Sequence, residues 1–200
     1  MDYTWPSHRS KLLAAEYSKW IAEKTVETIN EGDAHFVTFM YHPLPGTQTN
    51  KIERMGQDIE RIYNRLLTRC VRNPRSELYR DKRPILFASP DLPVYKRNKD
   101  SMESIIINDG LHMHGIVVAN RRARIPDMLD DYFQVEKYMK KFQTTKLRHF
   151  DVQRITHRPE YVADYGLKGL KRPTFSEDDV LVLPRVFKQP DRNPPCESPV

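Results

Sequence analysis

Two histidines are the first candidates for a chemical role. They form the segment His112-Met113-His114, within the apolar run from Gly110 to Val118. On a β-strand alternate residues point to the same side, so both imidazoles would share one sheet face while Met113 faces the core. Adjacent imidazoles are a good start for a metal site. A chain with seven histidines can contain such a pair by chance. Two buried histidines without partners would be costly, however, and the placement favours a metal or catalytic role.

The histidine pair needs a third ligand. A neighbouring hairpin strand would supply one most directly, which favours Glu103 over Asp109, although Glu103 could also be an exposed carboxylate at a strand edge. A zinc hydrolase could use His149 or His157, but neither has a diagnostic spacing. A cupin would carry a glutamate soon after the pair, and no carboxylate stands at residues 115–124.

A second reactive group lies in the segment Tyr161-Val-Ala-Asp-Tyr165-Gly-Leu-Lys168. On a helix, Tyr161, Tyr165 and Lys168 would share one face. A tyrosine oxygen can attack a phosphodiester and form a covalent phosphotyrosine, and a nearby cation stabilises the charge that develops. Two partly buried tyrosines beside a solvated lysine are the alternative. The apolar residues expected on the buried side are Val162, Leu167 and Leu170.

The elements that must position these groups follow from hydrophobic periodicity and turn signals. Helices are expected at 9–31 (ended by Gly32), 50–72, 127–141 and 159–170. Strands are expected at 35–41, 84–88, 104–107, 112–118 and 149–156, with a further short strand at 180–183 and a loop or hairpin arm at 90–101. The turn Asn108-Asp109-Gly110 would join the third and fourth strands in a hairpin. This order predicts an α+β fold, a central antiparallel β-sheet with flanking helices.

Composition agrees with one globular domain of 200 residues. We expect a single domain at 1–187, with its core at 34–170, and a disordered Pro-rich tail at 188–200. The net charge of +6 suits an acidic partner such as nucleic acid without requiring one. Cys70 and Cys196 form no metal or redox motif, and Cys70 should be buried. Without a long apolar run or a signal peptide, we expect an intracellular, cytoplasmic protein that makes no membrane contact.

Together these segments resemble the HUH endonuclease superfamily, which includes rolling-circle replication initiators, relaxases and single-strand transposases. His112-Met113-His114 resembles the His-hydrophobic-His strand of this superfamily. Tyr165-Gly-Leu-Lys168 resembles its Tyr-x-x-Lys helix. Phe36-Val37-Thr38-Phe39 resembles the Phe-x-Thr strand that comes earlier in its members. Their order and spacing fit over residues 34–170. The two tyrosines are most similar to those of initiators from small single-stranded DNA phages. Asp164 stands where relatives often carry lysine, which favours Tyr165 over Tyr161 as the nucleophile.

The resemblance implies a ferredoxin- or RRM-like sheet and an enzyme that nicks and joins single-stranded DNA at an origin or hairpin. His112, His114 and Glu103 would hold Mg²⁺ or Mn²⁺. Tyr165, or Tyr161, would form a 5′-phosphotyrosine while Lys168 assists by its charge. The basic residues that could follow the DNA backbone are Arg121, Arg122, Arg124, Lys137, Lys140, Lys141 and Arg148.

Three alternatives stay open at this point. A tyrosine transposase shares the same chemistry, although Tyr161 and the Thr38 strand favour a replication initiator. A non-catalytic nucleic-acid-binding module would not need the histidine pair, and an unrelated metal hydrolase would form no DNA adduct. The chain has no Walker-type P-loop, so any unwinding would come from another protein such as a host helicase. The enzyme would act as a monomer or a homodimer.

Overall fold

The computed structural model describes residues 8–92, 107–120, 146–172 and 174–185. Its α-helices are α1 (His8–Glu31), α2 (Gln48–Cys70) and α6 (Pro159–Gly166). Its strands are β1 (Gly32–Tyr41), β2 (Ile85–Asp91), β3 (His112–Asn120), β4 (Leu147–Arg154) and β5 (Leu181–Leu183). Short 3-10 helices are η1 (Glu77–Lys82), η2 (Ile107–Gly110), η3 (Lys168–Lys171) and η4 (Glu177–Asp179). The predicted α+β fold is confirmed.

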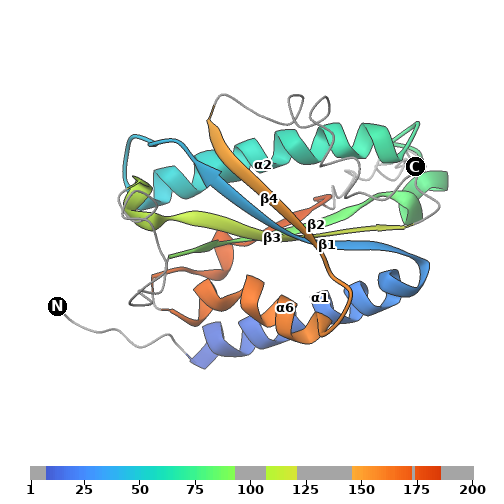
Figure 1. Cartoon of the computed structure of the whole chain (residues 1–200), viewed down its shortest axis with the longest axis horizontal. Helices are drawn as coiled ribbons and strands as arrows, with labels where there is room; N and C mark the ends of the chain where they lie inside the picture. The colour runs from blue at the N-terminus through green and yellow to red at the C-terminus, as the bar shows by residue number, and fades with distance from the viewer. Residues whose placement is uncertain (1–7, 93–106, 121–145, 173, 186–200) are drawn as a thin grey trace, which may run out of the picture.

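The five strands form one sheet in the order β4-β1-β3-β2-β5, and neighbouring strands are antiparallel. Because β3 lies between β1 and β2 and opposes both, β1 and β2 run parallel to each other. The helix α2 connects them, which makes the split β-α-β unit of ferredoxin-like domains. The central antiparallel sheet predicted from the sequence is therefore present (Figure 1).

Helices cover both faces of this sheet, with α2 on one side and α1 and α6 on the other (Figure 1). Apolar residues of α2 recur every three or four positions and are buried: Ile52, Met55, Ile59, Ile62 and Leu66. The side chain of Thr47 caps the first turn of α2 by accepting a hydrogen bond from the Asn50 amide at 3.3 Å. On the opposite face, Trp20 of α1 packs edge-on against Phe87 of β2, with ring centroids 4.8 Å apart.

The predicted hairpin between residues 104–107 and 112–118 is wrong. Residues 113–118 of β3 pair with β1 on one side and with β2 on the other, so neither edge is open to another strand. Ile107 begins η2 instead, and residues 104–106 lie outside the described part of the chain. The turn itself is present, because Asn108, Asp109 and Gly110 have φ values of 56°, 58° and 78°.

Two predicted boundaries also shift. The strand expected to end at residue 88 continues to Asp91, although Pro90 indicated a break. The strand β5 pairs only with residues 86–88, so beyond Ala88 the described structure leaves β2 as an edge strand, where proline is tolerated. The last predicted helix ends at Gly166 rather than at residue 170.

Of the remaining predictions about the fold, some are confirmed and others fall on residues that the structure does not describe. Cys70 is buried, and the short strand expected at 180–183 is β5. The predicted helix at 127–141 and the tail at 188–200 are not among the described residues. None of the helices in the described ranges combines the length and apolar character needed to cross a bilayer.

Asn108 anchors the turn that leads into β3. Its Oδ1 accepts a hydrogen bond from the Leu44 amide at 2.7 Å, and its Nδ2 donates to the carbonyls of Tyr41 and His42 at 3.3 and 3.0 Å. The side chain is buried and the backbone is left-handed. The start of β3, and with it His112, is therefore tied to the end of β1.

Replacing Asn108 should destabilise the fold in two separable ways. We expect Asn108→Ala to lower the free energy of unfolding by about 2–4 kcal/mol, because it removes three hydrogen bonds of about 1 kcal/mol each and places alanine in a left-handed conformation. Asn108→Gly loses the same hydrogen bonds without that strain and should fall between alanine and wild type. Urea denaturation measures both, and an Asn108→Ala protein as stable as wild type would contradict the anchoring role.

Candidate active site

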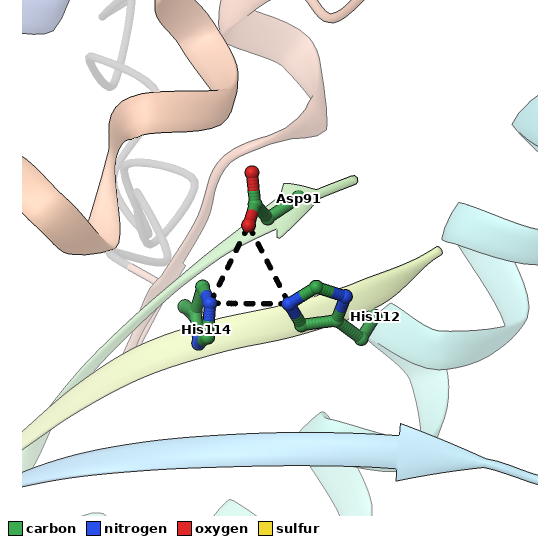
Figure 2. A group of neighbouring side chains, drawn as sticks. All are labelled: Asp91, His112 and His114. Carbon is green, nitrogen blue, oxygen red and sulfur yellow. Dashed lines mark hydrogen bonds and ion pairs between the residues drawn. The ribbon is translucent and has the colours of Figure 1, made fainter. Parts of the chain in front are cut away.

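An aspartate joins the two predicted histidines where two strands meet. The strand β3 begins at His112, β2 ends at Asp91, and the register pairs these two residues. The Oδ2 atom of Asp91 lies 3.4 Å from His112 Nε2 and 3.5 Å from His114 Nε2, and the two Nε2 atoms are 3.1 Å apart (Figure 2). Met113 is buried on the opposite face, as predicted. The three side chains form a group that could hold a metal ion.

Hydrogen bonds to the other ring nitrogens orient both imidazoles. The Nδ1 atom of His112 lies 2.8 Å from the Gly110 carbonyl, which can only accept, so Nδ1 carries the proton and Nε2 offers a lone pair. The Nδ1 atom of His114 lies 3.2 Å from the hydroxyl of Thr38, its partner across β1 and β3. A proton donated from this Nδ1 to Thr38 leaves the Nε2 of His114 free as a second ligand.

The arrangement of these atoms fits a divalent cation. With both Nδ1 atoms protonated, the two Nε2 lone pairs would face each other at 3.1 Å and would repel unless a positive charge lay between them. Asp91 is fully buried, and its Oδ1 atom accepts no hydrogen bond from the described residues. Two imidazole nitrogens and one carboxylate oxygen are a donor set that could hold a metal ion.

The electrostatics of the cluster keep His112 and Asp91 in the protonation states that a metal requires. Burial and the neighbouring His114 lower the pKa of His112, and they outweigh the opposite effects of Gly110 and Asp91. Burial alone would raise the pKa of Asp91, but His114, Lys168 and His112 outweigh it and hold this pKa below its usual value. At neutral pH the cluster therefore contains a neutral His112 and a carboxylate, as metal ligation demands.

Lys168 connects the cluster to the tyrosines. Its Nζ atom lies 2.9 Å from Asp91 Oδ2 and 4.0 Å from the centroid of the Tyr165 ring. Burial would lower the pKa of Lys168, but Asp91 and Tyr165 outweigh this effect and raise it, so the side chain stays cationic. The next residue, Gly169, permits this approach, since a Cβ atom there would lie 2.0 Å from the carbonyl oxygen of Pro90.

Tyr165 projects from α6 onto the same sheet face. Its ring centroid is 5.4 Å from that of His114 and 5.8 Å from that of Phe36. Tyr165 is 39% exposed, so a ligand in solvent can reach it. Tyr161, one turn earlier, is 65% exposed and lies 6.4 Å from Tyr165 between ring centroids.

The sequence identified most of the side chains that converge here. His112, His114, Tyr165 and Lys168 come together, and Tyr161 lies beside them at the surface. The continuous helix expected to carry the tyrosines and Lys168 ends at Gly166, so Lys168 arrives on η3. Of the residues predicted on the buried side, Leu167 and Leu170 are buried and Val162 is partly buried.

The third ligand position is taken, among the described residues, by Asp91, which the sequence reasoning missed. Glu103, the residue predicted for this position, lies outside the described ranges. Strand alternation could have placed Asp91 near the histidines. If the strand continues through Pro90, then Phe87, Ser89 and Asp91 share one face of it. Of the predicted DNA-backbone contacts, Arg148 lies on β4, and Arg121, Arg122, Arg124, Lys137, Lys140 and Lys141 are not described.

Comparisons of this chain with protein-family models, curated proteins and solved structures give no match.

Metal binding tests which carboxylate completes the cluster. We expect the wild-type protein to bind Mn²⁺ in isothermal titration calorimetry and Asp91→Asn to weaken that binding by at least about 100-fold, because partners that only orient a ligand already account for about 10- to 100-fold. Glu103→Gln is the matched control and should bind like wild type. The reverse pattern would assign the third position to Glu103.

The contact between Thr38 and His114 gives a second test of the same cluster. Thr38→Val keeps the shape of the side chain and removes the acceptor for His114 Nδ1, so Mn²⁺ affinity should fall by about 10- to 100-fold. Thr38→Ser retains the hydroxyl and should keep most of the affinity. If valine and serine bind Mn²⁺ equally well in the titration, Thr38 does not orient His114.

Proposed function

We propose that this chain is a metal-dependent endonuclease that nicks and rejoins single-stranded DNA, with Tyr165 as the nucleophile. One observation carries the proposal: Lys168 contacts both the Tyr165 ring and Asp91 of the histidine cluster. The resemblance to HUH enzymes requires a tyrosine, a lysine and a histidine pair to act together, and these residues lie side by side although they come from separate segments. The two-tyrosine pattern favours a rolling-circle replication initiator within that superfamily.

The proposed reaction is a transesterification. The phenolic oxygen of Tyr165 attacks the scissile phosphorus, and the bond from phosphorus to the 3′ oxygen breaks. The 5′ end is then held as a phosphotyrosine, the phenolic proton passes to water, and the departing 3′ oxygen takes up a proton. Since one phosphodiester replaces another, a 3′-hydroxyl can attack in reverse and rejoin the strand.

The side chains around Tyr165 have distinct tasks in this proposal. The rings of His114 and Phe36 hold the Tyr165 ring in place by direct contact. The ammonium of Lys168 lies beside that ring and stabilises negative charge on the phenolic oxygen and the phosphate. A divalent ion held by Asp91, His112 and His114 would polarise the scissile phosphate.

A non-catalytic DNA-binding module explains this site less well. A buried carboxylate surrounded by two imidazoles and an ammonium loses hydration and needs compensation, which is a poor way to stabilise a binding domain. DNA binding needs exposed cations along the backbone rather than a buried cluster. A tyrosine transposase would use the same chemistry at the same residues.

Formation of a covalent adduct tests the proposal. We expect wild-type protein, incubated with Mn²⁺ and a pool of labelled single-stranded oligonucleotides, to give a protein–DNA adduct on a denaturing gel. Tyr165→Phe and His114→Ala should abolish the adduct. Lys168→Met should slow its formation by about 100- to 1000-fold at saturating DNA, the effect of losing one stabilising charge in a transition state.

The neighbouring lysine provides a matched control. Lys171→Met removes the same charge from η3, but Lys171 is paired with Asp164 rather than with the cluster, so the rate should stay at the wild-type level. An adduct that persists in Tyr165→Phe, or that forms in EDTA, would contradict the proposed mechanism. Intact DNA binding without any adduct across a broad oligonucleotide pool would favour the binding module instead.

A further inference from the structure

The two tyrosines of α6 lie in different surroundings. Within the described part of the chain, the ring of Tyr161 contacts that of Tyr165, whereas Tyr165 also contacts His114 and Phe36. Tyr161 is 65% exposed, and its ring lies 26° from parallel to the Tyr165 ring. One tyrosine is thus held against the cluster, and the other presents an aromatic surface to solvent.

The charges beside the two tyrosines are opposite. Three residues after Tyr165 stands Lys168, whose Nζ lies over the Tyr165 ring. Three residues after Tyr161 stands Asp164, whose carboxylate forms an ion pair with Lys171 at 2.5 Å. Lys168 therefore offers a cation beside Tyr165, whereas the matching position after Tyr161 carries a carboxylate and offers no cation to a phosphate.

We infer that Tyr161 is a stacking platform for a nucleobase of the single strand, and not a second nucleophile. The ring of Tyr165 lies near-parallel to Tyr161 and so provides a neighbouring aromatic surface. Stacking on such a ring is tolerant of base identity and needs no hydroxyl. The two residues are four positions apart, about 6 Å along the axis of α6, so the platform would lie beside the phosphate that Tyr165 attacks. This last point rests on the proposed nicking function.

DNA binding in EDTA tests the platform without any cleavage. The probe is a single-stranded oligonucleotide of thymine and 2-aminopurine, whose fluorescence is quenched when the base stacks. Tyr161→Phe and Tyr161→Trp keep an aromatic ring and should retain both the quenching and the affinity. Tyr161→Leu should lose the quenching and bind about 5- to 100-fold more weakly, the usual contribution of one stacked base.

Tyr79→Leu is the matched control, since Tyr79 is a partly exposed aromatic residue on η1 at the other end of β2. It should bind the probe like wild type. Circular dichroism checks that each variant is folded. Because Tyr161 is largely exposed, its replacement should leave the fold intact. Wild-type affinity and quenching in Tyr161→Leu would overturn the platform.

The covalent reaction with DNA tests whether Tyr161 also acts as a nucleophile. Tyr161→Phe lacks the hydroxyl but keeps the ring, so it should still form the adduct and rejoin the strand in Mn²⁺. Loss of either step in Tyr161→Phe would make Tyr161 a nucleophile and overturn the inference. The two proposals fail separately, because a platform seen in EDTA without any adduct in Mn²⁺ would refute nicking alone.

Discussion

The buried carboxylate of Asp91 is the group on which the rest of the site depends. A carboxylate with no exposed surface is stable in a protein only if opposite charge and hydrogen bonds replace its hydration. Here Lys168 supplies the charge at 2.9 Å, and a cation held between Asp91 and the two histidines of β3, which face the same oxygen, would add to it. The need to compensate the charge of Asp91 therefore favours the packing of η3 and α6 against the sheet. The same contacts bring together the atoms that could bind a cation.

Strand register brings these groups together. The register places Asp91 opposite His112, and Thr38 opposite His114. A slip by one residue would turn both histidines toward α2 and separate them from Tyr165. Gly115 contributes to this close pairing, because a Cβ atom there would lie 2.6 Å from the Phe87 carbonyl oxygen. The cluster thus lies where the end of β2 pairs with the start of β3, beyond the residues of β2 that β5 covers.

Local periodicity predicted the parts of the site that lie within single elements. The shared face of His112 and His114 follows from strand alternation, and the neighbouring tyrosines follow from helical spacing. Asp91 was missed because Pro90 indicated the end of the strand, which hid the alternation, and because the pairing of β2 with β3 joins segments separated by about twenty residues. The hairpin prediction failed for the same reason: a strong local turn favoured the nearest segment, whereas β1 and β2 provide the larger paired surfaces.

Exposure rises steadily across the site and suggests how a strand would enter it. Asp91 is fully buried, the side chain of Lys168 is 22% exposed, and Tyr165 and Tyr161 are 39% and 65% exposed. Charge is concentrated at the buried end and aromatic surface at the exposed end. Flexible DNA would first meet the rings, which accept any base, and the phosphate would reach the charged end only after the strand is held. Under the proposed function, base binding at Tyr161 and chemistry at Tyr165 and Lys168 are therefore neighbouring but separate steps along one line of side chains.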